Sequence, residues 1–303
     1  LVELTEEEYL MLFDMHHIIS DGVSMEILIK EFAALYQGQS LPELKLQYKD
    51  FSVWQNQLFQ TEKIKEQEDY WLDTYSGEIP TLNLPTDYPR PSLQSFSGDM
   101  LGFEVGEELT DGLKELAAKK GTTMYMLLLS AYHILLSKYS GQEDIVIGTP
   151  IAGRRHADLE NIIGMFVNML ALRNVTERGQ SFSQFLAQVK ENTLQAFDNQ
   201  EYQFEKLVER LNIPRELSRH PLFDVVFSLQ NPQPKIEEMD GLQLSPLDFE
   251  NKIAKYDLTL EALERDGKIS FIFEYCTCLF KRETIRRLSE HYTNLLKEIV
   301  ERP

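Results

Sequence analysis

The run Tyr9-Leu-Met-Leu-Phe-Asp-Met-His-His-Ile-Ile-Ser-Asp-Gly22 decides the fold of the first part of this chain. Residues 9–15 are apolar almost throughout, which predicts a buried strand with sheet neighbours on both sides. After Gly22 the apolar residues recur at helical spacing as far as Tyr36. A turn between a buried strand and a helix presents its side chains rigidly, so residues 16–22 form the first candidate site.

Strands and helices alternate along the rest of the chain. Helical spacing of apolar residues predicts helices at 23–36, 50–60, 66–75, 107–120, 123–139, 181–200, 204–211 and 283–301. Short apolar runs predict strands at 9–15, 100–105, 144–149, 166–173, 223–230, 256–264 and 268–275. The tripeptide Arg265-Asp266-Gly267 between the last two strands is a hairpin signal. This mixture indicates an α/β or α+β fold.

The stretch 76–98 interrupts the alternation, because it carries four prolines, which exclude a helix or a central strand. We therefore expect a proline-rich linker there, between a first lobe at 1–75 and a second lobe at 99–303. Only eight residues precede the expected strand at 9–15. This predicts that the sequence begins inside its first lobe and leaves that lobe incomplete.

Composition excludes several classes of function. The 303 residues carry a formal net charge of −19, which argues against a surface that contacts the phosphates of a nucleic-acid duplex. Cys276 and Cys278 are the only cysteines, and their spacing favours reduced structural thiols over a disulfide or a zinc site. The apolar runs are too short to span a bilayer and no signal peptide is recognised, so we expect a cytoplasmic protein without membrane contact.

The candidate site combines residues that suit acid/base chemistry. Adjacent residues of an extended chain point to opposite sides, so one of His16 and His17 can face a cavity while the other packs behind it. Asp21 can pin the turn or pair with an arginine, and Gly22 allows close backbone approach or an unusual dihedral. These residues by themselves also fit a structural turn or a fragment of a metal site. No further ligand cluster supports a metal, and no G-x-S-x-G elbow supports a Ser–His–Asp hydrolase.

Residues 16–22 resemble the HHxxxDG motif of the condensation domains of non-ribosomal peptide synthetases. Three further matches follow in the order of that family. Residues 48–55 are similar to Y-x-D-[FY]-A-V-W, residues 147–154 with 164–168 to I-G-x-P-x-A-G-R and G-x-F-V-N-T, and residues 219–227 to H-x-P-L-F-[DE]-V-x-F. Val23 and Met169 stand where many members have tryptophan and threonine. The family's first two motifs, which include an arginine, have no counterpart.

The resemblance implies a two-lobed fold like that of chloramphenicol acetyltransferase, with the motif histidines in a tunnel between the lobes. It implies peptide-bond formation between two thioesters that arrive on phosphopantetheine arms of upstream and downstream peptidyl carrier proteins, beside an adenylation domain. No cofactor or metal bound by the chain itself is expected. Two alternatives share this fold. An epimerisation domain needs a second acid/base group, and a non-catalytic recruitment domain typically lacks the motif histidine.

By the same resemblance, His17 is the catalytic candidate, either as a base toward the attacking amine or as a group that positions it. His16 is expected to be structural. Asp21 is expected to form an ion pair, and Arg154 is one candidate partner. Gly22 is expected to supply backbone geometry and an amide near a developing oxyanion.

Three further motif residues have two open interpretations. Trp54, Arg154 and Asn168 are expected to line the substrate tunnel or to make buried structural contacts. For Trp54 we favour a place in the core, and for Arg154 and Asn168 neither interpretation is preferred.

Overall fold

The computed structural model describes residues 1–214, 216–230, 241–245, 247 and 252–303. These residues form two compact units, and each is described by itself. The first unit comprises Leu1–Thr61 and Ala152–Val167, with residues 241–245. The second comprises Glu62–Ile151 and the other described residues from 168 to 303.

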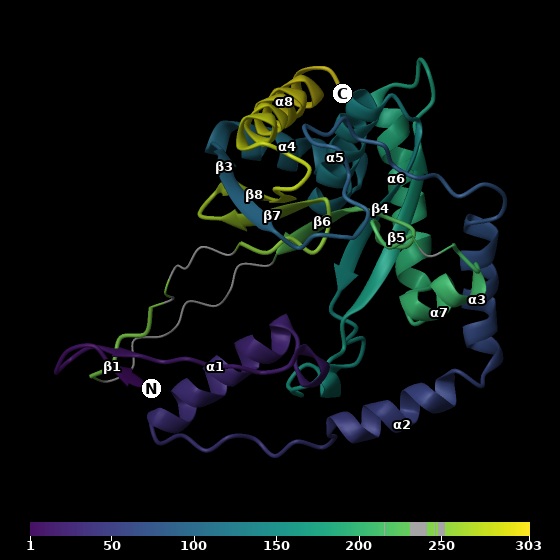
Figure 1. The fold of residues 1–303 in the computed structure, drawn as a ribbon. Helices are drawn as coiled ribbons and strands as arrows, with labels where there is room; N and C mark the ends of the chain where they lie inside the picture. The colour runs from purple at the N-terminus through teal and green to yellow at the C-terminus, as the bar shows by residue number, and fades with distance from the viewer. Residues whose placement is uncertain (215, 231–240, 246, 248–251) are drawn as a thin grey trace. The chain divides into compact units, whose positions relative to one another are not determined.

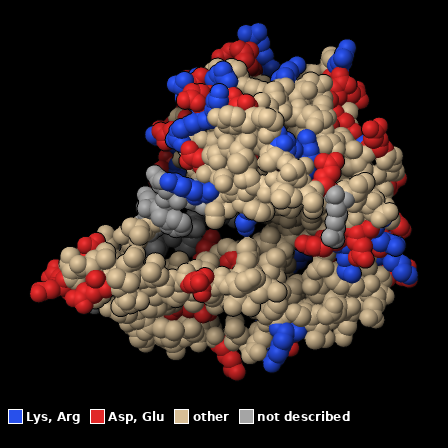
Figure 2. Space-filling model, viewed as in Figure 1, with Lys and Arg blue, Asp and Glu red and all other residues tan. Residues whose placement is uncertain are grey.

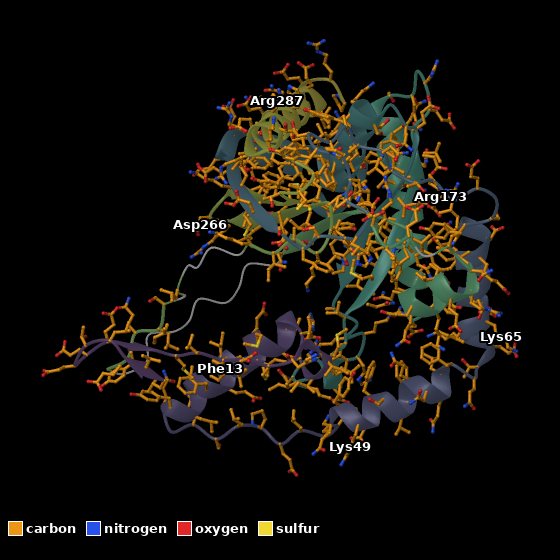
Figure 3. All side chains as sticks on the ribbon, viewed as in Figure 1. Phe13, Lys49, Lys65, Arg173, Asp266 and Arg287 are labelled. Atoms are coloured by element: carbon orange, nitrogen blue, oxygen red, sulfur yellow. The ribbon has the colours of Figure 1, made fainter. Side chains whose placement is uncertain are left out.

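The first unit opens with a short hairpin, in which β1 (Val2–Glu3) pairs antiparallel with β2 (Tyr9–Leu10). The expected buried strand at 9–15 is wrong. The ladder ends at Leu10, and the side chains that follow are exposed, 66% for Leu12 and 50% for Phe13, which is labelled in Figure 3. A strand persists only where neighbours complete its backbone hydrogen bonds, and β1 is the only described strand that pairs with this segment.

Two predicted helices of the first unit are confirmed, with ends within about two residues of the predicted ones. Helix α1 spans Gly22–Tyr36, and its N-cap is Asp21, whose Oδ1 accepts a hydrogen bond from the Ser24 amide at 2.8 Å. Helix α2 spans Tyr48–Leu58, and Asp50 in its first turn accepts a hydrogen bond from the amide of the preceding Gln47 at 2.8 Å. Local capping therefore fixes where both helices begin.

The second unit is built on one six-stranded sheet with the strand order β3-β8-β7-β6-β4-β5. The strands are β3 (Gly98–Val105), β4 (Asp144–Ile151), β5 (Asn168–Val175), β6 (Val225–Gln230), β7 (Leu258–Arg265) and β8 (Lys268–Cys276). Strand β6 runs parallel to β4 and β7, and the other pairs are antiparallel. The predicted hairpin is confirmed, with φ of 52° at Asp266 and 76° at Gly267 in the turn between β7 and β8. The mixed α/β class is thereby confirmed.

Helices cover one face of this sheet. They are α4 (Glu107–Lys120), α5 (Met124–Ser140), α6 (Phe182–Asp198) and α8 (Arg282–Glu301). Figure 1 shows α4, α5 and α8 on the same side of the sheet. Tyr132 of α5 packs against Phe273 of β8 with ring centroids 6.3 Å apart, and Tyr292 of α8 packs against Phe271 at 5.5 Å. Alternate residues of β7 and β8 therefore face the helices and form the core.

Helix α3 (Glu62–Thr74) belongs to the second unit, where it lies beside α7 (Phe204–Arg210). Trp71 donates its indole N–H to the carbonyl of Asn199 at 2.9 Å, and the Tyr75 hydroxyl donates to the carbonyl of Ala171 at 2.8 Å. These bonds tie α3 to the end of α6 and to β5. The boundary between the two units consequently falls after Thr61, and not within 76–98 as the prolines suggested.

The proline-rich stretch 76–98 has neither helix nor strand before Gly98, in agreement with its prolines. It nevertheless lies against the second unit. Arg90 forms an ion pair with Asp257, and Arg219 donates to the carbonyl of Leu82 at 2.9 Å. The stretch is therefore an extended covering segment of the second unit.

Surface charge and helix hydropathy agree with the composition. Figure 2 shows acidic and basic side chains interspersed over the face that it draws. Within the part of the chain that the structure describes, no helix is both long and apolar enough to cross a membrane.

Candidate active site

Three segments that lie far apart in the sequence meet within the first unit. They are the turn at 16–24, the start of α2 at Tyr48, and the stretch 153–166 that separates β4 from β5 in the sequence. The first carries the two motif histidines, and the other two hold the turn in place. Asp21 is the residue that joins the turn to the third segment.

The Asp21 carboxylate is buried and accepts five hydrogen bonds. Its Oδ2 accepts from Arg154 Nη1 at 2.7 Å and from the Phe166 amide at 3.0 Å. Its Oδ1 accepts from Arg154 Nη2 at 3.0 Å, from the Ser24 amide at 2.8 Å and from the Ser24 hydroxyl at 2.7 Å. The exposed fraction is 0% for the Asp21 side chain and 4% for that of Arg154. The predicted ion pair between these two residues is therefore confirmed, as a buried bidentate pair.

These contacts keep Asp21 ionised. Burial by itself would raise the pKa of the Asp21 carboxyl, but the hydrogen bonds from Arg154, Ser24 and Phe166 outweigh it and lower that pKa below its usual value. A carboxylate with a lowered pKa and five donors is a poor proton acceptor at neutral pH. The geometry therefore gives Asp21 the role of fixing the turn, and argues against a proton relay through it.

Arg154 makes further contacts besides the ion pair. Its guanidinium lies 4.2 Å from the ring centroid of Phe166, and Nη2 also donates to the carbonyl of Ile162 at 3.1 Å. The preceding Gly153 has φ of 68°, and a Cβ there would lie 2.0 Å from the carbonyl oxygen of Phe166. Glycine is required at this position, because it alone allows the backbone to come so close to the Phe166 carbonyl. Of the two interpretations left open for Arg154, the buried structural contact is the one observed.

An aromatic cluster packs behind the ion pair. Tyr48 meets Phe166 edge to face with ring centroids 5.1 Å apart, and its hydroxyl donates to the carbonyl of Met165 at 2.8 Å. Phe51 packs on Phe166 at 4.6 Å. Trp54 packs only on the edge of this cluster and is 47% exposed, so the expectation that it lies in the core is wrong. Position 54 falls on the outer face of α2, a detail that the motif spacing did not reveal.

His17 is oriented by the backbone of its own turn. It begins a single turn of 3-10 helix, His17–Ile19, and its Nδ1 lies 2.7 Å from the carbonyl oxygen of Ser20. A carbonyl oxygen can only accept, so Nδ1 carries the proton and donates it. In the neutral imidazole, this contact selects the tautomer in which Nε2 is an unprotonated acceptor. His17 is exposed, so Nε2 is available to a ligand.

His16 has a different role. Its Nδ1 accepts a hydrogen bond from the Ile18 amide at 3.1 Å, which caps the 3-10 turn that begins at His17. The two neighbouring imidazoles therefore have opposite tautomers. His16 uses its Nδ1 lone pair to hold the turn, and His17 uses its Nδ1 proton for the same purpose and presents Nε2. This agrees with the structural role expected for His16.

Gly22 is the first residue of α1 and is exposed. Its φ is not among the positive values, and a Cβ there would meet nothing within 4 Å. Neither the close backbone approach nor the unusual dihedral expected for Gly22 is therefore observed. Its amide belongs to the first turn of the helix, where N–H groups have no partner within the helix. Gly22 is exposed, so this end of the helix is open to solvent.

Asn168 belongs to the second unit, at the start of β5. Its Nδ2 donates to the carbonyls of Gln200 and Tyr202, both at 3.0 Å. Its Oδ1 accepts from the Phe204 amide at 3.1 Å and from the Met169 amide at 2.9 Å. The side-chain amide is thus used to fix the chain before α7, which supports the structural interpretation.

Two residues of the site were not predicted. The Ser24 hydroxyl lies within hydrogen-bonding distance of Asp21 Oδ1, of the Gly164 carbonyl at 2.9 Å and of the Gly164 amide at 3.0 Å. A Cβ at Gly164 would lie 2.2 Å from the ring of Tyr48. The spacing Asp21-x-x-Ser24 is a helix-cap pattern and could have drawn attention to Ser24. The contact between Ser24 and Gly164 has no such local sequence signal, because Gly164 lies 140 residues further along the chain.

Comparison with known proteins identifies the family of this chain. A family model described as the condensation domain matches residues 1–303. The chain belongs to the condensation-domain family. It is 56% identical over 304 residues to gramicidin S synthase 2 of Aneurinibacillus migulanus, and the alignment covers 100% of this chain. The chain spans only 7% of the length of that relative, which is a multidomain synthetase.

Solved structures share the fold. The X-domain from teicoplanin biosynthesis is 26% identical, with a TM-score of 0.86 over 94% of this chain and 68% of the X-domain chain. The epimerization domain from the third module of tyrocidine synthetase B is 21% identical, with a TM-score of 0.73 over 95% of this chain and 68% of its own. At 21% identity, the similarity to the epimerization domain supports a shared fold and nothing beyond it. The expected fold like that of chloramphenicol acetyltransferase agrees with these neighbours.

Proposed function

We propose that this condensation domain forms the peptide bond between a donor aminoacyl or peptidyl thioester and the amine of an acceptor aminoacyl thioester. Both substrates would be carried on the phosphopantetheine arms of peptidyl carrier proteins, in a synthetase that also holds an adenylation domain. The observation that carries the proposal is the His17 tautomer. The hydrogen bond from Nδ1 to the Ser20 carbonyl at 2.7 Å leaves Nε2 free to accept from an attacking amine.

In this reaction the acceptor nitrogen attacks the donor thioester carbonyl. The C–N bond forms, the C–S bond breaks, and the sulfur leaves as a thiolate. His17 Nε2 accepts a hydrogen bond from the attacking amine, which turns the nitrogen lone pair toward the carbonyl. The proton that the nitrogen loses passes to Nε2 and from there to the thiolate, so the imidazole ends unchanged.

Positioning carries much of the acceleration. An α-amine has a pKa of about 8, so a fair fraction of it is already neutral near pH 7 and a strong base is not required. Holding the amine beside the thioester converts an encounter into a nearly unimolecular step. The buried pair of Asp21 with Arg154 keeps the turn rigid, and the amide of Gly22 would donate to the oxyanion of the tetrahedral intermediate.

Product analysis with two loaded carrier proteins tests the proposal. The expected product is a dipeptide on the acceptor carrier, with the donor residue unchanged in configuration. A change in configuration without a new peptide bond would instead indicate epimerisation. Unchanged substrates, with a properly folded protein, would indicate a recruitment domain and refute the proposal.

A further inference from the structure

The face of the second unit's sheet that lies opposite its helices carries an unusual polar group. On β7 and β8, alternate residues such as Leu260 and Phe273 point to the helices and are fully buried. Side chains alternate along a strand, so the residues between them point to the opposite face. There Thr259 stands directly across from Glu274 in the ladder, and Glu261, two residues further along β7, is the diagonal neighbour of Glu274. Two carboxyl groups and a hydroxyl therefore share one small area of the sheet.

No residue in the described part of the chain pairs with Glu261 to compensate its charge. Among the residues that the structure describes, no hydrogen bond or ion pair is found for its half-buried carboxyl group. Burial raises its pKa, and the nearby Glu274 carboxyl raises it further. Glu274 is only partly compensated. Burial raises its pKa, while the amide of Lys255, at 3.4 Å, and the charge of that lysine act in the opposite direction.

Thr259 provides an independent observation at the same place. It is only 6% exposed, and its Oγ1 has no hydrogen-bond partner in the described part of the chain. A buried hydroxyl without a partner costs free energy, so a ligand that supplies a hydrogen bond there would be favoured. Its position across from Glu274 and two residues from Glu261 places this unused group beside both carboxyls. Together, the two carboxyls and the hydroxyl suit a ligand that donates hydrogen bonds and carries positive charge.

We propose that Glu261, Glu274 and Thr259 bind the side-chain ammonium of a basic aminoacyl substrate of the condensation reaction. This assignment of a substrate group rests on the function proposed above. A primary ammonium has three N–H donors and one positive charge, and the sheet face offers three acceptors with excess negative charge. A divalent cation fits less well, because the described residues include no group of three or more His, Cys, Asp or Glu side chains that could hold a metal.

Such a substrate offers two ammonium groups, the side chain of a basic residue and the α-amine of the acceptor residue. The proposed reaction requires the α-amine to be neutral and in contact with His17 Nε2, so the side-chain ammonium is the one bound at this face. Three pantetheine thioesters separate these sources. Glycyl-pantetheine carries only an α-ammonium, Nα-acetyl-lysyl-pantetheine carries only a side-chain ammonium, and N-acetylglycyl-pantetheine carries neither. Their dissociation constants are measured by isothermal titration calorimetry with the full chain.

The expected result is that Nα-acetyl-lysyl-pantetheine binds about tenfold or more tightly than the neutral probe, since a hydrogen bond to a charged group is worth that much. Glu261→Gln should abolish this preference and leave the affinity for the neutral probe unchanged. Thr259→Val should weaken it. The matched control is Glu264→Gln on the same strand, since Glu264 already pairs with Lys114 at 2.7 Å, and it should retain the preference.

Equal affinity of the parent chain for the lysyl and the neutral probes would overturn the inference, as would a preference for glycyl-pantetheine alone or a preference that survives Glu261→Gln. A circular dichroism melt verifies that each variant is folded. Peptide formation on loaded carriers is measured separately. A chain that makes peptide but shows no ammonium preference refutes this inference alone, and one that shows the preference but makes no peptide refutes the proposed function alone.

Discussion

Replacing Asp21 by asparagine tests how the turn that carries the motif histidines is held. An asparagine whose oxygen occupies the Oδ1 position keeps the bonds from Ser24. At the Oδ2 position its NH₂ group would face two donors, Arg154 Nη1 and the Phe166 amide, which bond there at 2.7 and 3.0 Å in the parent. Two hydrogen bonds to a charged group are lost, and Arg154 is left buried without its counter-charge.

Breaking one side of such a buried pair costs about 3–5 kcal/mol. The free energy of unfolding, measured by urea denaturation, should fall by that amount in Asp21→Asn, and activity should fall with it. The matched control is Asp158→Asn in the same unit. Asp158 pairs with Lys45 at 3.3 Å, but the lysine side chain is 80% exposed, so the loss should stay below about 1 kcal/mol. An Asp21→Asn variant that is as stable as the parent yet inactive would refute this reasoning and favour a direct catalytic role.

The pH dependence of this difference has a definite sign. The pKa of Asp21 is lowered in the folded chain, so its contribution to stability is present above the unfolded carboxyl pKa of about 4. It is lost as the pH falls through the lower folded pKa. The difference in unfolding free energy between parent and Asp21→Asn should therefore be constant from pH 7 to about 5 and shrink below about 4. A difference that grows on acidification would contradict the assignment of Asp21 as a buried carboxylate.

Three further predictions follow from packing and charge. Gly164→Ala should destabilise the chain by about 1–3 kcal/mol in a urea melt, because its Cβ would lie 2.2 Å from the Tyr48 ring, whereas Gly22→Ala, which meets nothing within 4 Å, should leave stability nearly unchanged. Equal effects would show that the close approach is not real. Limited proteolysis should yield a resistant fragment that begins near Glu62, since hydrogen bonds tie α3 to the second unit; a fragment beginning near Gly98 would contradict them. Carrier-protein binding should change little with salt, because a net charge of −19 offers no broad positive field to an acidic partner, and affinity that falls steeply with added salt would disagree.

Local signals in the sequence were sufficient to predict most helices and the hairpin. Helix α4 was predicted to the residue, because Gly121 takes φ of 61° at its C-cap and the acidic and basic ends of the helix suit its dipole. Thr123 likewise caps α5, with Oγ1 accepting from the Met126 amide at 3.2 Å. Such signals act within about four residues, which is why they can be read from one sequence.

Features that depend on distant partners were harder to predict. The apolar character of 9–15 predicted a buried strand, but apolar residues form a strand only where other strands lie beside them. At the site, the pairing of Asp21 with an arginine could be predicted because both lie in motifs of known chemistry. The contact of Ser24 with Gly164 could not, since it depends on how the stretch before β5 returns to the turn.

A single-turnover assay of His17→Ala tests the central claim most directly, namely that His17 Nε2 assists peptide-bond formation. Donor and acceptor carriers are loaded before mixing, and the rate of dipeptide formation is compared with that of the parent. Loss of a positioned acid/base group should reduce the rate by about 10²-fold or more. The control His156→Ala removes another exposed histidine of the first unit, 72% exposed at its side chain, and should keep the parent rate. A folded His17→Ala variant that forms dipeptide at the parent rate would contradict the account.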